Sequence, residues 1–164
     1  MKATSIDVRP VVAEVVAGIE QEAGDGHTFA VDLPDEGVFA LADAEKLRQI
    51  VGHLVDNAVK FSPAGGLVRV GVEEEDGVVV VSVADEGVGI PPGEQERIFT
   101  KFYRRESGRS GTGLGLFLAQ GLVERMGGRI RLESVDGAGS TFFVEVPAVR
   151  PAGRERTEKQ EVAS

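Results

Sequence analysis

The stretch VVVVSVADEGVGIPPG, residues 78–93, joins a run of valines to a loop with closely spaced glycines. The run of apolar residues predicts a buried strand. Glycines directly after a strand often mark a place where the backbone passes close to a phosphate or a base. Asp85 precedes the first of these glycines, so a carboxylate stands at the head of the loop. The stretch therefore predicts a ligand site, and the glycine spacing decides which fold can build it.

That spacing excludes the two most familiar phosphate-binding folds. A dinucleotide-binding fold requires G-x-G-x-x-G at the start of a helix that directly follows the strand. Here the glycines are Gly87, Gly89 and Gly93, and Pro91-Pro92 lies where that helix would begin. Because proline lacks an N–H donor and restricts the preceding residue, a turn is expected after Gly89. The chain has no G-x-x-x-x-G-K-[ST] sequence, so a P-loop is excluded as well.

The composition indicates one ordinary globular domain and narrows its functions. The chain has 164 residues with 41% hydrophobic content, enough for a single core. It has no cysteine, and its two histidines, His27 and His53, are too far apart to suggest zinc. A formal net charge of −9 argues against nonspecific nucleic-acid binding. No apolar run is long enough to span a membrane and no signal peptide is visible, so we expect a cytoplasmic chain without direct membrane contact.

The hydrophobic pattern predicts an α+β fold, with a layer of helices on one face of a mostly antiparallel sheet. One helix begins near Pro10 and a longer one is capped by Asp43. The expected strands are residues 5–8, 28–33, 38–42, 67–74, 78–84, 129–134 and 140–146, and further helices are expected at 93–99 and 112–126. Residues 1–147 form the predicted domain. Residues 148–164 are charged and poor in large apolar residues, and we expect a disordered tail.

A basic segment interrupts this acidic chain between residues 97 and 109. It holds a single acid, Glu106, against five bases: Arg97, Lys101, Arg104, Arg105 and Arg109. Such a segment suggests a local anionic partner. A solvated loop with scattered arginines is the alternative that these residues leave open.

Four stretches and a closing one follow each other in a recognisable order: DNAVKF at 56–61, DEGVGI at 85–90, ERIFTKFYR at 96–104, GTGLGL at 111–116 and GAGSTF at 137–142. Together they resemble the catalytic, ATP-binding domain of sensor histidine kinases. That family shares a superfamily with DNA gyrase, the heat-shock chaperone ATPases and the mismatch-repair ATPases. The resemblance covers roughly residues 5–147 and implies a Bergerat-type fold: a two-layer sandwich in which three helices cover one face of a mixed, mostly antiparallel sheet.

The resemblance implies that Asp85 binds adenine. A carboxylate only accepts hydrogen bonds, and the exocyclic amine of adenine is a donor, whereas guanine presents a carbonyl oxygen at that position. Gly87 and Gly89 are expected to let the base approach the backbone closely, with Ile90 completing the motif. Thr141 corresponds to a threonine that supports the adenine, with a plain strand threonine as the alternative.

The resemblance also implies a metal and phosphate side. The Asn57 side chain offers the oxygen ligand that Mg²⁺ prefers, and Lys60, one helical turn on, is expected to reach a phosphate. Many relatives carry Asn at the position of His53, and the hydrolysing relatives carry a Glu there as general base. Because His53 is neither, we expect it to pack at the rim of the site rather than to act in catalysis.

The motif GTGLGL is expected to open a helix whose free N–H groups bind the polyphosphate of ATP. Its residues are Gly111, Thr112, Gly113, Leu114, Gly115 and Leu116, of which the leucines are expected to pack beneath the site. Residues 100–110 correspond to the mobile ATP lid of the family. Within that lid the resemblance places Tyr103 near the nucleotide and Arg104 at the terminal phosphate, with Lys101 as a weaker candidate.

The chain lacks the phosphoacceptor that such a kinase needs. In the family this is a histidine followed by an acid, whereas His27 precedes Thr28 and His53 precedes Leu54. We therefore expect a histidine-bearing dimerisation domain and a response regulator as partners, and a nearly inactive isolated chain. Two alternatives stay open: a serine kinase that sequesters a sigma factor, and a nucleotide-binding module without kinase activity. ERIFTKFYR favours the histidine kinase over the first.

Overall fold

A five-stranded sheet forms one layer of the molecule, in the order β2-β4-β5-β7-β6. The computed structural model describes residues 2–23, 26–101 and 114–149. β2 pairs with β4 in parallel, and the other neighbours are antiparallel. The strands are β2 (His27–Asp32), β4 (Gly66–Glu75), β5 (Val78–Asp85), β6 (Arg129–Ser134) and β7 (Ser140–Pro147).

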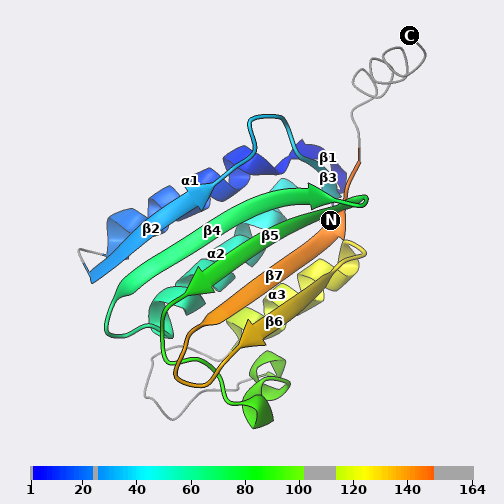
Figure 1. Cartoon of the computed structure of the whole chain (residues 1–164). Coiled ribbons are helices and arrows are strands. Elements are labelled where there is room, and N and C mark those ends of the chain that lie inside the picture. Colours follow the sequence, from blue (N-terminus) through cyan, green and yellow to red (C-terminus); the bar gives the residue numbers. More distant parts are fainter. Residues whose placement is uncertain (1, 24–25, 102–113, 150–164) are drawn as a thin grey trace.

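Three helices cover one face of this sheet, as Figure 1 shows: α1 (Val8–Ala23), α2 (Ala44–Lys60) and α3 (Gly115–Arg125). Asp43 caps α2 as predicted, because its Oδ1 accepts a hydrogen bond from the Lys46 N–H at 3.1 Å. The apolar stripe of α2, from Leu47 to Ala58, is fully buried. This arrangement confirms the predicted helix layer on a mostly antiparallel sheet.

Side chains on alternate positions of the strands form the core beneath the helices. On β5 the buried residues are Val79, Val81, Val83 and Asp85, so the last of these positions is a carboxylate in an otherwise apolar row. Among the described residues, Phe142 of β7 is the largest fully buried side chain. The Phe99 ring meets Phe142 edge to face, with 6.1 Å between centroids.

Two predicted helices differ from the structure. Residues 93–99 form two separate 3₁₀ turns, η2 (Pro92–Glu94) and η3 (Arg97–Phe99), in place of one helix. Pro91 and Pro92 lie at the start of this segment, where the N–H groups of a helix are unpaired and proline is tolerated, so they do not account for the break between the two turns. α3 begins at Gly115, later than predicted, and Thr112 lies outside the described residues.

A small two-stranded ribbon brings the first strand and the residues after the last strand together on β3. β1 (Thr4–Asp7) pairs antiparallel with β3 (Phe39–Ala42). After β7 the chain continues along β3, since Ala148 bridges Ala40 and the Val149 N–H donates to the Phe39 carbonyl at 2.9 Å. Backbone pairing therefore extends two residues beyond the predicted boundary at Pro147. Residues 150–164, where we predict a disordered tail, lie outside the described residues.

Candidate functional site

The predicted binding motifs gather at one edge of the sheet. The register pairs His27 with Gly66, Val68 with Asp85, and Ser140 with both Asp85 and Ser134. β5 and β6 therefore end at the edge where β2, β4 and β7 begin. The end of α2 reaches the same edge, because the Val88 N–H donates to the Phe61 carbonyl at 3.0 Å. The loop after β5 thus lies between a helix end and two strand ends.

Asp85 is buried at this edge, with 7% of its surface exposed. Its Oδ1 accepts a hydrogen bond from the Gly87 N–H at 2.9 Å. Its Oδ2 is buried and has no hydrogen-bond partner among the described residues. Burial raises the pKa of Asp85 above its ordinary value, and the N–H groups of Gly87 and Ser140 counter this only in part. A buried acceptor without a donor is costly, so the Oδ2 atom fits a donor that a ligand supplies.

The loop that follows Asp85 is held by hydrogen bonds from distant parts of the chain. The Val88 carbonyl accepts from the Gly137 N–H at 2.6 Å, in the β6–β7 turn. The Ile90 N–H donates to Ser134 Oγ at 2.8 Å. The Glu86 carboxylate accepts from the Leu67 N–H at 2.9 Å, at the start of β4. The loop is therefore fixed by the protein itself, and the Ile90 side chain is fully buried.

The two predicted glycines of this loop are required by protein packing. A Cβ atom on Gly87 would lie 2.0 Å from the Phe61 carbonyl oxygen. A Cβ atom on Gly89, whose φ is +71°, would lie 2.0 Å from the Val135 carbonyl oxygen. Their absence of side chains lets the loop approach α2 and the β6–β7 turn. The close approach of a base to these glycines stays a prediction.

Thr141 does not share a face of the sheet with Asp85. Directly paired residues point to the same face, and successive residues alternate. Asp85 pairs with Ser140, which is 3% exposed, whereas Thr141 pairs with Ala84 and Glu133. Ser140 is therefore the hydroxyl beside Asp85, one position before the residue that we predicted. The register of β5 against β7, rather than the motif itself, reveals this.

Asn57, predicted to bind the metal, and Lys60, one of the residues predicted to reach a phosphate, lie on α2. Asn57 is half-buried and stands one helical turn after His53. Lys60 forms an ion pair with Asp56 at 2.8 Å and keeps 30% of its side chain exposed. In this structure the Lys60 ammonium is thus engaged by a carboxylate rather than directed to an open phosphate position.

His53 is half-buried against the start of α3. A Cβ atom on Gly115 would lie 3.2 Å from His53 Nδ1, so Gly115 gives the imidazole room. Burial lowers the pKa of His53, an effect that Lys60 reinforces and Asp56 opposes. The neutral form of the imidazole is therefore favoured. The nearby N-terminus of α3 acts in the same direction, because the positive end of a helix dipole disfavours a cation.

The structure describes only some of the other predicted residues. Leu116 is 7% exposed and packs in the core, and Leu114 precedes the first turn of α3. Lys101 is exposed and is the last described residue before the gap. Tyr103, Arg104, Gly111, Thr112 and Gly113 lie outside the described residues.

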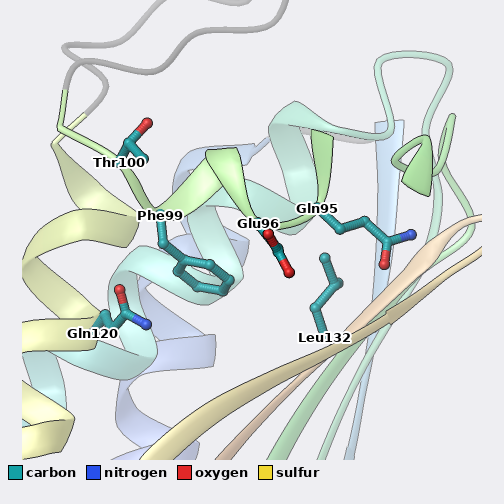
Figure 2. A pocket seen from close by; sticks show the side chains of 6 residues that line it. All are labelled: Gln95, Glu96, Phe99, Thr100, Gln120 and Leu132. Atoms are coloured by element: carbon teal, nitrogen blue, oxygen red, sulfur yellow. The ribbon is translucent and has the colours of Figure 1, made fainter. Parts of the chain in front are cut away.

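A pocket of about 450 Å³ lies between the η2–η3 segment, α3 and β6 (Figure 2). None of the predicted ATP-binding residues lines it; the lining residues are Gln95, Glu96, Phe99, Thr100, Gln120 and Leu132. Within the described ranges, no three His, Cys, Asp or Glu side chains are grouped so that they could hold a metal ion. None of the described helices combines the length and apolar character of a membrane span.

Comparison with known families shows the family to which this chain belongs. A family profile described as "Histidine kinase-, DNA gyrase B-, and HSP90-like ATPase" matches residues 42–150, more than half of the chain. The chain belongs to this family. It is 38% identical over 125 residues to the sensor histidine kinase WalK of Bacillus subtilis (strain 168), which is 73% of this chain and 20% of WalK.

Solved structures agree with this assignment. The mycobacterial sensor histidine kinase MprB superposes with a TM-score of 0.80 and 28% identity, over 91% of this chain and 99% of that one. Full-length ShkA in complex with AMPPNP superposes with a TM-score of 0.77 and 32% identity, over 92% of this chain and 32% of ShkA. The fold is thus the Bergerat fold of histidine kinase catalytic domains. The chain spans a fifth to two fifths of the length of the first curated relatives. Neither the anti-sigma-factor kinase nor the binding module without kinase activity is favoured by these comparisons.

Proposed function

We propose that this chain is the ATP-binding catalytic part of a sensor histidine kinase, and that it transfers the γ-phosphoryl group of ATP to a histidine outside residues 1–164. The buried Oδ2 atom of Asp85, which lacks a partner among the described residues, carries this proposal. The exocyclic amine of adenine is a donor that would satisfy it. Guanine would set a carbonyl oxygen against the carboxylate, and such a mismatch in a buried position costs about 1–3 kcal/mol.

The remaining parts of the site follow from the chemistry of the side chains. Asn57 would contribute one oxygen ligand to Mg²⁺, and Lys60 would exchange its bond with Asp56 for a phosphate. Arg104 would neutralise charge on the terminal phosphate. Positioning and charge neutralisation are the expected sources of catalysis, since phosphoryl transfer asks for little covalent chemistry from the protein.

The phosphoryl acceptor has to come from elsewhere. Neither histidine is followed by an acid, and His27 Nε2 lies 2.8 Å from the Ser62 carbonyl, which engages that nitrogen. In the proposed transfer the bond between the γ-phosphorus and its bridging oxygen breaks, a P–N bond forms on the acceptor imidazole, and ADP leaves. The acceptor would lie on a dimerisation domain, a response regulator would receive the phosphoryl group next, and the use of ATP implies a cytoplasmic location.

Nucleotide titrations test the base assignment. The parent chain should bind ATP at least about tenfold more tightly than GTP, and Asp85→Asn should weaken ATP binding about tenfold or more. Asn places an amide donor against the adenine amine while its oxygen can still accept from Gly87. Asp76→Asn is the matched control, because Asp76 is exposed in the turn at the far end of β5. Equal affinity of the parent for ATP and GTP would refute the proposal.

A phosphotransfer assay tests the reaction. The chain alone should turn over ATP slowly, and addition of a cognate histidine-bearing domain should yield acid-labile phosphohistidine. Arg104→Ala should reduce this transfer more than it reduces ADP binding. Rapid ATP hydrolysis by the isolated chain, abolished by His53→Ala, would instead identify an ATPase.

A further inference from the structure

Both backbone polar groups of Ile90, the last residue of the DEGVGI loop, are held by side chains. The Ile90 N–H donates to Ser134 Oγ at 2.8 Å, and the Ile90 carbonyl accepts from Gln95 Nε2 at 2.8 Å. Gln95 Nε2 also donates to the Ser134 carbonyl at 3.2 Å. One glutamine amide thus bridges the loop after β5 and the end of β6. Neither Gln95 nor Ser134 belongs to the residues that the motifs predicted.

Ser134 uses the full hydrogen-bonding capacity of its hydroxyl at this point. Its Oγ accepts from the Ile90 N–H, donates to the Gly139 carbonyl at 2.9 Å, and lies 2.9 Å from Ser140 Oγ. A serine hydroxyl has one proton and two lone pairs. With that proton directed to Gly139, the Ser140 hydroxyl is the donor to Ser134. The orientation of Ser140, the direct neighbour of Asp85 on β7, is therefore set by Ser134.

We propose that Gln95 and Ser134 are positioning residues for the nucleotide base: they fix Ile90, at the far end of the loop that begins at Asp85, and Ser134 also fixes Ser140, the cross-strand partner of Asp85, so that the base-binding edge is held in place before ATP arrives. This inference rests on the proposed function, because it concerns the same site. A preformed edge loses less conformational freedom when it binds a ligand. Loss of either side chain would free the end of the loop and lower the affinity for adenine nucleotides.

Gln95 also links this edge to the segment that leads towards residues 102–113. It stands between η2 and η3, and η3 carries Phe99 onto Phe142. Figure 2 shows Gln95 and Phe99 extending in different directions from this segment. The Phe99–Phe142 contact and the Gln95 amide both attach this segment to the sheet. The amide is the attachment that reaches the base-binding loop.

Two variants at adjacent positions, Gln95→Glu and Glu96→Gln, test the proposal. Gln95→Glu keeps the size of the side chain but sets a carboxylate against the two carbonyl oxygens that Gln95 now donates to. We expect Gln95→Glu to bind an ATP analogue about fivefold or more weakly than the parent, in titrations well below the melting temperature. Glu96→Gln is the matched control, since Glu96 is exposed and lies beside Gln95. It should bind the analogue within about twofold of the parent.

Ser134 variants separate positioning from a purely structural role. Ser134→Ala should weaken binding of the ATP analogue to a similar degree and should speed hydrogen exchange of the Ile90 amide. Ser134→Thr keeps a hydroxyl oxygen at this position and should restore the parent's affinity and the parent's exchange rate. A lower melting temperature with unchanged affinity in Gln95→Glu and Ser134→Ala would overturn the inference. In that case the parent would still prefer ATP over GTP, so the proposed function would survive. Loss of that preference in the parent itself would refute both.

Discussion

At the base end of the candidate site, the loop from Gly87 to Ile90 is hydrogen-bonded to α2, to the η2–η3 segment and to the β6–β7 turn. At the phosphate end, Lys60 is paired with Asp56, and part of the predicted glycine motif lies outside the described residues. At the proposed base end, Asp85 Oδ2 lacks a hydrogen-bond partner among the described residues, whereas at the proposed phosphate end the Lys60 ammonium already has one.

The two ends differ in how much of the proposed nucleotide binding is already built into the fold. At the proposed base end, the only unmet requirement of the carboxylate among the described residues is a donor for Asp85 Oδ2. At the proposed phosphate end, Lys60 would exchange its ion pair with Asp56 for one with a phosphate. Burial acts alike on one titrating group at each end: it raises the pKa of Asp85 and lowers the pKa of His53. Both shifts favour the neutral form in the protein without nucleotide.

The largest effect is expected from a side chain on Gly87. A Cβ atom there would overlap the Phe61 carbonyl oxygen, which also accepts the Val88 N–H at 3.0 Å and so holds the two backbones close together. We expect Gly87→Ala to lower the free energy of unfolding by about 3 kcal/mol or more. Gly93→Ala is the control in the same segment, because nothing lies within 4 Å of a Cβ atom at Gly93. Equal denaturation midpoints for the two variants would show that the loop is not packed as described.

Asp85→Asn should stabilise the nucleotide-free protein while it weakens ATP binding. The amide keeps an acceptor for the Gly87 N–H and removes a charge from a buried position. We expect the melting temperature at pH 7 to rise by about 2–4 °C. A lower melting temperature would mean that Asp85 serves the fold rather than the ligand.

Separating Lys60 from Asp56 should change the phosphate end alone. Lys60→Gln is expected to weaken ATP binding about three- to tenfold and to leave adenosine binding within about twofold. Asp56→Asn removes the competing carboxylate of this partly exposed pair and should strengthen ATP binding by about two- to threefold. Parallel losses for ATP and adenosine in Lys60→Gln would contradict the division of the site into two ends.

The smallest effects concern pH and have opposite signs at the two ends. For His53, whose pKa is lowered by folding, the contribution to stability is present above pH about 6.5 and is lost as the pH falls through the folded-state pKa. For Asp85, whose pKa is raised, the contribution is present below pH about 3.9 and is lost as the pH rises through the folded-state pKa.

Melting curves from pH 4 to 8 measure both contributions. His53→Gln should flatten the decline of stability on the acid side. Asp85→Asn should have a higher melting temperature than the parent at neutral pH, and this difference should disappear towards pH 4. Identical pH profiles for the parent and both variants would refute the two assignments.

The sequence predicted the strands, the Asp43 cap and the position of Asp85 at the end of β5, because alternation and capping depend on nearby residues. It did not separate Ser140 from Thr141. Two adjacent hydroxyl residues in a strand face opposite sides, and the pairing of Asp85 with Ser140 decides which one lies at the site. That pairing joins residues far apart in the sequence.

Long-range contacts also explain the other gaps in the prediction. Gly87 and Gly89 are constrained by the Phe61 and Val135 carbonyls, which no local pattern brings near them. Gln95 bonds to Ile90 and Ser134 across two different elements. The sequence indicated the chemistry of the base, whereas the support for the base-binding loop required the three-dimensional structure.

Amide hydrogen exchange in the nucleotide-free protein tests the preformed base edge most directly. The relevant amides are Gly87, Val88 and Ile90, whose N–H groups are bonded to Asp85, Phe61 and Ser134. We predict slow exchange at these amides, close to that of the β5 core, and little change when a Mg-ATP analogue binds. Rapid exchange in the free protein, with protection only after the analogue is added, would contradict the claim that the fold builds the base end before the nucleotide arrives.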